Sequence, residues 1–266
     1  MKFNERISIQ YTNLTSTEKR ICTSILDNPK IIINHSIIEA ADLCQTSKSA
    51  ILRFVKKLEY RGYSEFKYAI EVEYNQSPVN YEVRENNSII HQIADSYCST
   101  INQIAHLGFE DKLSELAKMI DEYKYVMSLA IGNTAFCAQQ LVYSLYSHNH
   151  FSNYVTDDVQ FDFLANCLNK EYLLIIFSVS GSYNTFVNLV KSAKSANAKV
   201  ILITMNPDTP LLKYCSMNFI IPSTVSPIKN KKVLKQLDNR TILYFFAELI
   251  SYYYGLYLEE KHSSTN

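Results

Sequence analysis

The stretch YLLIIFSVSGS, residues 172–182, decides the fold class. Its first six residues form an unbroken apolar run rich in branched side chains, which predicts a strand that is buried on both faces. The run ends in small hydroxyl residues and Gly181, and a helical pattern begins near Tyr183. A strand that passes through a short polar loop into a helix is the repeating step of an α/β domain.

The alternation of strand and helix patterns continues on both sides of this stretch. The other short β-rich runs are KYVMSLAIG (124–132), HFSNYV (150–155), KVILIT (199–204) and NFIIP (218–222). Helical patterns follow most of them. Apolar strands that alternate with helices predict a parallel sheet with helices on both faces.

The apolar run Thr241–Leu258, TILYFFAELISYYYGLYL, could be read as a membrane span because it has 18 residues. Glu248 lies near its middle, where a charge would be costly in a bilayer. We therefore expect a buried or interface helix and no membrane partner. The N-terminus, MKFNERISIQY, lacks the apolar segment of a signal peptide, so we expect a cytoplasmic protein.

Cysteines and histidines give no sign of a metal site or a cofactor. The six cysteines are scattered without a CxxC pair, and most lie inside apolar helical patterns, which is typical of reduced core thiols. The nearest histidines, His148 and His150, fall at the start of a strand pattern and are expected in a surface or loop position. A metal site needs three or four converging ligands.

The chain has 266 residues and 26 cationic side chains against 26 carboxylates, which excludes a bulk polycation. The length allows two domains of modest size. Residues 75–88 are polar and include Pro78, which is typical of a linker. We predict an all-α domain over residues 1–76, a linker over 77–88, an α/β domain over 89–260 and a tail over 261–266.

The all-α segment contains a helix-turn-helix pattern. Thr15 and Glu18 form a capping box at the start of one helix, which Pro29 ends. A second capping box, Ser36 to Glu39, opens a short helix through Leu43. After the polar turn 45–47, Ser47 caps a third helix that we expect over residues 48–60.

The third helix has an apolar face and a basic face. At ~100° per residue, Ile51, Phe54, Val55 and Leu58 share one side, and Ser49, Arg53 and Lys56 share the other. Residues 48–67 carry six cations and two anions. This pattern fits a helix in a DNA major groove, although an ordinary amphipathic helix with a solvated basic face has the same pattern. The candidate DNA-binding residues are Ser47, Lys48, Ser49, Leu52, Arg53, Lys56 and Lys57.

Two loops that follow predicted strands, residues 131–134 and 178–182, predict an anion site. Backbone N–H groups at the N-terminus of a helix favour an anion, and serine hydroxyls add donors without bulk. Ligands of open parallel sheets bind at the carboxyl edge of the strands. A serine-rich helix cap without any ligand is the alternative. The candidate effector-binding residues are Gly132, Asn133, Thr134, Ser178, Ser180, Gly181, Ser182 and Tyr183.

Residues 14–67 resemble the N-terminal helix-turn-helix domain of the RpiR family of bacterial transcriptional regulators. The resemblance rests on LTSTEKRICTSILDNP and on SIIEAADLCQTSKSAILRFVKKLEYRGYSEFK, with Ser47 before the recognition helix and the pair Arg53-Phe54 within it. The chain departs from the family pattern at Glu59, where glycine is usual, and at Ala50, where threonine is usual. The resemblance implies a regulator that binds double-stranded operator DNA.

Residues 125–258 resemble the SIS (sugar isomerase) domain, which senses the effector in this family. Ser178-Val179-Ser180-Gly181 looks like the family's Ser-x-Ser-Gly phosphate loop, and Thr209-Pro210-Leu211 resembles its Ser-Pro-Leu. Tyr183 stands where a threonine usually helps to hold the phosphate, so it would crowd the pocket or offer a phenol donor. Ala130 and Thr134 replace a glycine and a serine. Arg240 begins the final helix, which the family often uses for dimer contacts.

These observations predict a two-domain, non-enzymatic transcriptional regulator of carbohydrate metabolism. Its SIS-like domain would sense a phosphorylated sugar, and the protein would act as a homodimer or a tetramer. We expect no catalytic residue, metal or cofactor. A phosphosugar isomerase is one alternative, and a regulator whose ligand-free SIS domain serves only dimerisation is another.

Overall fold

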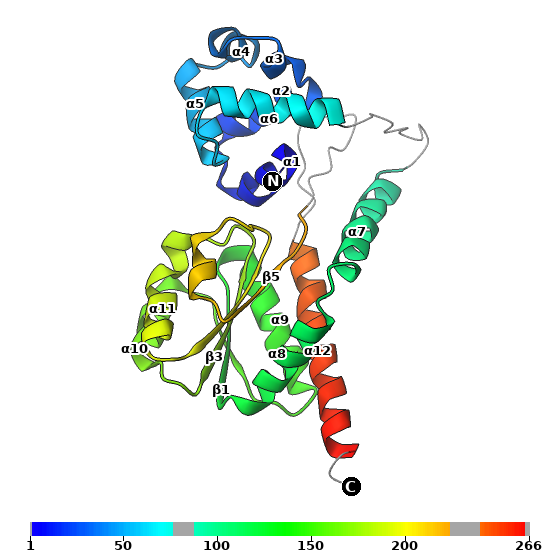
Figure 1. Ribbon diagram of the computed structural model, residues 1–266, viewed down its shortest axis with the longest axis vertical. Coiled ribbons are helices and arrows are strands. Elements are labelled where there is room, and N and C mark those ends of the chain that lie inside the picture. The colour runs from blue at the N-terminus through cyan, green and yellow to red at the C-terminus, as the bar shows by residue number, and fades with distance from the viewer. Residues whose placement is uncertain (1, 77–87, 224–239, 264–266) are drawn as a thin grey trace. The chain divides into compact units, whose positions relative to one another are not determined.

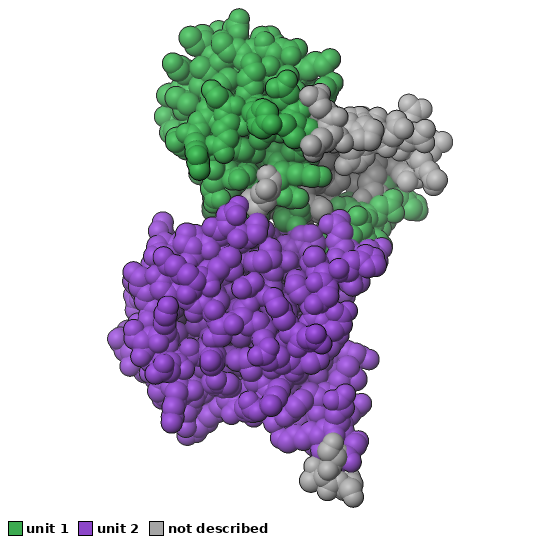
Figure 2. Space-filling model, viewed as in Figure 1, with its two compact units in different colours: residues 1–100, 223–237 green, residues 101–222, 238–266 purple. Residues whose placement is uncertain are grey.

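The computed structural model describes residues 2–76, 88–223 and 240–263, which form two compact units (Figures 1 and 2). The first unit comprises residues 1–100 and 223–237, and the second comprises residues 101–222 and 238–266. Most of the predicted linker, residues 77–87, lies outside the described residues, as do residues 264–266 of the predicted tail.

The N-terminal unit is helical, as predicted. Its elements are α1 (Phe3–Gln10), the 3-10 turn η1 (Tyr11–Asn13), α2 (Ser16–Asp27), α3 (Lys30–Ile33), α4 (Ile37–Leu43), α5 (Lys48–Lys57), α6 (Tyr63–Gln76) and the start of α7 (Ile89–Ala105). Both capping boxes are confirmed, at Thr15 for α2 and at Ser36 for α4. Ser47 caps α5, as predicted. The one-turn helix α3, which starts directly after Pro29, was not predicted.

Helix α5 ends earlier than predicted, at Lys57 instead of Tyr60. Glu59 has a φ of 63°, a left-handed conformation that ends a helix. The Tyr60 N–H donates to the Val55 carbonyl at 3.2 Å, and the Glu59 N–H donates to the Lys56 carbonyl at 2.9 Å. This Schellman motif would suit glycine at position 59, since glycine adopts a positive φ without a Cβ penalty.

The predicted apolar face of α5 forms part of a core. Ile51, Phe54, Val55 and Leu58 are fully buried. They belong to a cluster with Ile21 and Ile25 of α2 and Phe66 of α6. The core therefore holds one side of α5 and leaves the opposite side on the surface.

The second unit contains the predicted parallel sheet. The strands are β1 (Tyr125–Leu129), β2 (Asn153–Val155), β3 (Tyr172–Ser178), β4 (Lys199–Thr204) and β5 (Met217–Ile220), in the order β2-β1-β3-β4-β5, and all pairs are parallel. The helices are α8 (Glu110–Glu122), η2 (Gly132–Thr134), α9 (Ala135–Tyr146), α10 (Asp158–Cys167), α11 (Tyr183–Ser195), η3 (Pro210–Tyr214) and α12 (Arg240–Ser263). Figure 1 shows α10 and α11 on one face of the sheet and α8, α9 and α12 on the other.

Side chains from both sheet faces reach into apolar layers. Leu174 and Ile176 of β3 pack with Phe186 and Val190 of α11. On the other face, Phe246 of α12 is buried, and its ring centroid lies 5.0 Å from that of Phe219. Helix α12 is thus packed against the sheet, and no described helix has the length and apolar character to cross a membrane.

Some predictions for single residues need correction. Cys22, Cys44 and Cys137 are buried, but Cys98 and Cys167 are exposed, so the core-thiol prediction is wrong for those two. Two helices, α7 and α8, precede the first strand of the sheet. Gly108, with a φ of 64°, lies between them.

Candidate DNA-binding face and effector site

The N-terminal half of α5 presents the predicted polar residues to solvent. The Ser47 hydroxyl accepts from the Ala50 N–H at 3.2 Å and lies 2.9 Å from the Ser49 hydroxyl. Lys48 and Arg53 are exposed, and Leu52 is half-buried between them. Among the described residues, no hydrogen bond or ion pair engages the charged ends of Lys48 and Arg53. This half of the helix is therefore free to meet a ligand.

The C-terminal half of α5 differs because its cations have partners within the domain. Lys56 is exposed, and its ammonium donates to the Arg61 carbonyl at 2.6 Å. Lys57 donates to a Glu18 carboxylate oxygen and to the Asn13 carbonyl, both at 2.7 Å. The candidate DNA-binding residues thus share one helix, but the structure ties Lys57 to the body of the domain.

Arg6 of α1 contacts the C-terminal end of α5, and the sequence analysis did not predict this contact. Its guanidinium donates to the Leu58 carbonyl at 2.9 Å and lies 4.6 Å from the centroid of the Tyr60 ring. A cation beside the last carbonyl groups of a helix interacts favourably with the helix dipole. Arg6 is 52 positions away from Leu58 in sequence, so no local pattern signals this contact.

The two predicted effector loops lie at the same edge of the sheet. Strands β1 and β3 are neighbours in register, with Leu129 opposite Ile176, so the loops that follow them are adjacent. Gly132 and Gly181 have φ values of 63° and 57°, which other residues rarely adopt. Gly132 and Asn133 are exposed, whereas Thr134 is buried. The structure therefore brings together the two groups of candidate residues.

The loop after β3 leads directly into the N-terminus of α11. The Ser182 N–H donates to the Ser178 hydroxyl at 3.3 Å, and the Ser182 hydroxyl lies 2.8 Å from that of Thr185. Ser182 precedes α11 without capping it through its side chain. The N–H groups of the first turn of α11 are thus left without a side-chain cap. Such N–H groups, together with nearby hydroxyls, bind phosphate or carboxylate.

Residues at the end of β4 and in the loop after it support the loop after β3 through hydrogen bonds. They were not predicted as part of the site. The Asn206 amide donates to the Ser180 carbonyl at 3.0 Å, and the Thr204 hydroxyl donates to the Val179 carbonyl at 3.2 Å. The Thr209 hydroxyl donates to the Gly181 carbonyl at 2.6 Å. All three side chains are buried. These three hydrogen bonds connect the carbonyl groups of the loop after β3 to buried side chains that follow β4 or end it.

Gly181 and Thr209 are in close contact. A Cβ at position 181 would lie 2.7 Å from the Cβ of Thr209, closer than two carbon atoms can approach. Position 181 therefore requires glycine both for its backbone angle and for space. The Thr209-Pro210-Leu211 motif was noted in the sequence, but its contact with the loop spans 28 positions and has no local signal.

Tyr183, the predicted departure from the family pattern, is hydrogen-bonded to Tyr214 of η3. This bond, together with the charges of Lys213 and Lys191, lowers the pKa of the Tyr214 phenol, although burial acts in the opposite direction. The Lys213 ammonium lies 6.0 Å from the centroid of the Tyr183 ring. The phenol of Tyr183 thus has a partner in the protein, beside a group of lysines.

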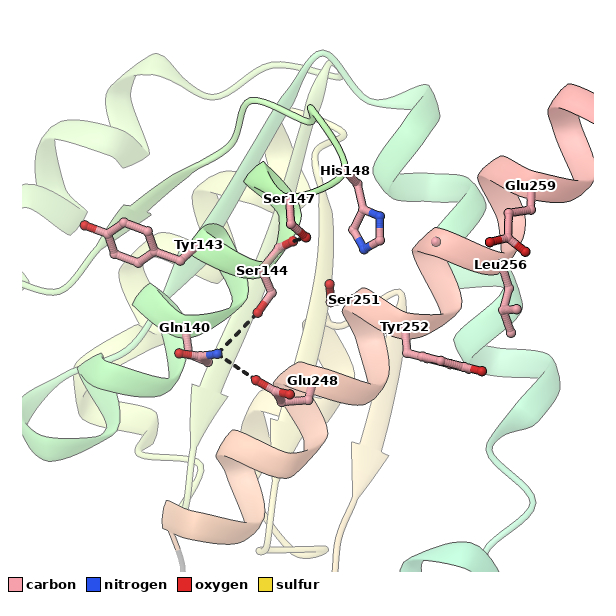
Figure 3. Close-up of a pocket in the computed structure, with 11 residues that line it drawn as sticks. Gln140, Tyr143, Ser144, Ser147, His148, Glu248, Ser251, Tyr252, Leu256 and Glu259 are labelled. Carbon is pink, nitrogen blue, oxygen red and sulfur yellow. Dashed lines mark hydrogen bonds between the residues drawn. The ribbon is translucent and has the colours of Figure 1, made fainter.

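A separate groove of about 580 Å³ lies between α9 and α12 (Figure 3). The Gln140 amide donates to the Glu248 carboxylate at 2.7 Å and to the Ser144 hydroxyl at 3.3 Å. His148 lies in the turn after α9, as expected, and its ring approaches Gly255, where an added Cβ would be 2.8 Å away. None of the candidate effector residues lines this groove.

The described residues contain no group of three His, Cys, Asp or Glu side chains that could hold a metal ion. The rings of His148 and His150 both pack edge-on against Tyr254. His150 also bonds the Ile120 carbonyl at 2.9 Å, so its role is in packing of the loop.

Comparison with known proteins supports both domains. Residues 1–77 match the helix-turn-helix domain of the rpiR family, and residues 119–234 match the SIS domain. An uncharacterized HTH-type transcriptional regulator of Clostridium perfringens is 24% identical over 260 residues, which cover 95% of this chain and 93% of that protein. The HTH-type transcriptional regulator HexR of Escherichia coli is 24% identical over 224 residues, covering 82% of this chain and 76% of HexR.

The fold is also similar to that of a solved structure along nearly the whole chain. The Vibrio vulnificus NanR protein, solved in complex with ManNAc-6P, superposes with a TM-score of 0.54 at 17% identity, covering 98% of this chain and 97% of NanR. The two domain matches and the observed fold agree. The chain therefore carries an N-terminal helix-turn-helix domain of the rpiR family and a C-terminal SIS domain.

Proposed function

We propose that this protein is a DNA-binding transcriptional regulator of carbohydrate metabolism whose SIS domain senses a phosphorylated sugar. The observation that carries the proposal is the exposed side of the N-terminal half of α5, the second helix of a helix-turn-helix, where the charged ends of Lys48 and Arg53 have no partner among the described residues. In such motifs, the N-terminal residues of the second helix contact base edges in the major groove.

The side chains of α5 suit distinct roles on DNA. Arg53 can donate two hydrogen bonds to one guanine, which makes it the candidate for sequence readout. Lys48, Lys56 and the hydroxyls of Ser47 and Ser49 suit phosphate contacts, and Leu52 suits a thymine methyl group. A homodimer or a tetramer acting in the cytoplasm would place two such helices on a roughly palindromic operator.

The effector site is the loop after β3 with the loop after β1 beside it. A sugar phosphate would receive hydrogen bonds from the first-turn N–H groups of α11 and from the hydroxyls of Ser178, Ser180 and Ser182. Gly132, Asn133 and Thr134 would contact the sugar side. The NanR complex supports this choice of ligand class, since that protein shares the fold and holds ManNAc-6P.

The domain content favours a sensor over the isomerase alternative. Aldose–ketose isomerisation needs a general base positioned beside the phosphate site. The relatives described above are transcriptional regulators, and an isomerase has no evident use for the helix-turn-helix domain at residues 1–77. We therefore infer a sensor without catalytic activity.

The DNA-binding claim is tested by measuring affinity for fragments from the gene's own neighbourhood. Arg53→Ala should weaken binding to the specific fragment by about 1–3 kcal/mol, or roughly 5- to 150-fold. Arg20→Ala is the matched control, because Arg20 is an exposed arginine on α2 of the same domain. Equal effects of the two substitutions, or no specific fragment, would overturn the proposal.

The effector claim is tested by thermal unfolding of the full chain with a panel of sugar phosphates. A ligand that binds the folded state raises the unfolding temperature by mass action. We expect one sugar phosphate to do so in the wild type and to lose this effect in Ser180→Ala. Absence of stabilisation by every member of the panel would support the alternative in which the SIS domain serves only dimerisation.

A further inference from the structure

We infer that Glu18 and Lys57 are a positioning pair that holds the recognition helix α5 against α2, and that Lys57 does not contact DNA phosphate. The inference rests on the proposed DNA-binding function. It also changes the role of Lys57, which the sequence pattern groups with the DNA-binding residues.

The geometry of the pair is that of an internal tie. Lys57 is the last residue of α5, and its ammonium lies 2.7 Å from a Glu18 carboxylate oxygen and 2.7 Å from the Asn13 carbonyl. The Glu18 side chain is only 10% exposed, and that of Lys57 is 31% exposed. One ammonium group thus joins the end of α5 to η1 and to the first turn of α2.

Glu18 has a second task, which couples the pair to the start of α2. The same carboxylate oxygen accepts from the Thr15 N–H at 2.7 Å and from the Thr15 hydroxyl at 3.0 Å. Burial alone raises the pKa of Glu18, but the hydrogen bonds from Lys57 and Thr15 outweigh it and lower the pKa. Glu18 therefore stays ionised and binds both helices.

The tie takes two of the three N–H donors of the Lys57 ammonium and holds the side chain toward Glu18. If its ammonium turned outward, it would leave a buried carboxylate without its cation. The free-energy cost of breaking a buried ion pair is larger than the stabilisation gained from forming an exposed one. Arg53 lies one turn before Lys57 on the same helix, and its own guanidinium has no ion pair among the described residues. The tie at the end of α5 thus sets the position from which Arg53 reaches a base.

The test measures specific DNA affinity of the full-length protein across a range of salt concentrations. A lysine that contacts phosphate contributes about 0.9 to the slope of log affinity against log salt. Lys48→Met, the matched control on the free half of α5, should reduce the slope by about this amount. Lys57→Met should weaken binding at every salt concentration and leave the slope unchanged.

Glu18→Gln separates positioning from charge. The substitution removes a negative charge, so simple electrostatics predicts tighter binding to DNA, whereas loss of the tie predicts weaker binding. We expect weaker binding, and we expect the double variant Glu18→Gln/Lys57→Met to be no weaker than Lys57→Met alone. Circular dichroism at the assay temperature identifies the folded variants, and Lys57→Arg, which keeps the charge, should retain more affinity than Lys57→Met.

Three results would overturn the inference. The first is a salt slope that falls in Lys57→Met by the same amount as in Lys48→Met, and the second is tighter DNA binding by Glu18→Gln. The third is that folded variants of the pair lose stability but keep the wild-type affinity for DNA. If the wild-type protein bound no fragment specifically, the proposed function itself would fail. That outcome differs from failure of the positioning role, in which the wild type and Lys48→Met behave as expected.

Discussion

Replacing Gly181 with alanine should damage the effector loop far more than the same change at Gly132. Both glycines have a left-handed backbone, with φ values of 57° and 63°. They differ in their surroundings. A Cβ at Gly132 would meet no atom within 4 Å, whereas a Cβ at Gly181 would lie 2.7 Å from the side chain of Thr209. The pair therefore separates the cost of the backbone angle from the cost of lost space.

The two costs can be estimated. An alanine in the left-handed conformation lowers the free energy of unfolding by about 1–2 kcal/mol. Alanine also lowers the conformational entropy of the unfolded chain, which offsets about 0.4–1 kcal/mol, so Gly132→Ala should destabilise the protein by about 1 kcal/mol. At Gly181, Thr209 must also move. The movement breaks its 2.6 Å hydrogen bond to the Gly181 carbonyl. A buried hydrogen bond that loses one partner costs about 1–3 kcal/mol, which brings Gly181→Ala to about 3 kcal/mol.

Differential scanning calorimetry of the full-length protein measures this difference. In a domain of this size, each kcal/mol shifts the unfolding temperature by about 2–4 °C. We expect the transition of the α/β domain to fall by about 2–4 °C in Gly132→Ala and by about 6–12 °C in Gly181→Ala. The Gly181→Ala protein should also lose its response to sugar phosphates. Equal small shifts for the two variants would refute the claim that Thr209 holds the loop through this contact.

Three further predictions concern single side chains. Glu59→Gly should be more stable than Glu59→Ala by about 1 kcal/mol in urea unfolding, because both lose the carboxylate and only alanine keeps the strain of the positive φ. No difference would argue against the Schellman end of α5. Burial lowers the pKa of His150 from 6.5, against the opposing effects of the Ile120 carbonyl and Asp121. Its neutral form is therefore favoured in the folded state, so its contribution to stability is complete above about pH 6.5 and declines as the pH falls further. Unfolding temperatures measured across this range should show a shallower acid decline in His150→Asn than in the wild type, and parallel curves would contradict the assignment. Lys213→Met should raise the pKa of the Tyr214 phenol, since the nearby ammonium helps to lower it. The pKa of Tyr214 would be measured by ultraviolet titration, with Tyr214→Phe as the reference. An unchanged pKa in Lys213→Met would contradict this contact.

Local patterns predicted the elements of the fold well. The apolar runs at residues 172–177 and 199–204 became central strands because strands buried on both faces must be apolar throughout. Thr15, Ser36 and Ser47 marked helix starts because a hydroxyl at that position satisfies a free N–H group. The end of α5 was missed because a glutamate at position 59 hides a backbone angle that glycine would have signalled.

The candidate site was predicted only as far as its own segments reach. The hydroxyl-rich loop after β3 was found because its residues are consecutive in sequence. Thr209 and Asn206, which hold that loop, come from the next strand end and carry no local signal. The partner of Lys57 lies 39 positions away, so the basic face of α5 gave no means of separating an internal lysine from a free one. Such contacts are set by tertiary packing.

If this protein couples binding of a phosphorylated sugar to binding of DNA, the coupling itself can be measured. The affinity of the full-length protein for its specific fragment would be determined with each member of a sugar phosphate panel, in the wild type and in Ser180→Ala. We expect one sugar phosphate to change the DNA affinity of the wild type by about 5- to 150-fold and to leave that of Ser180→Ala nearly unchanged. If no member of the panel changed the affinity of a wild type that binds DNA specifically, the sensing role would be contradicted.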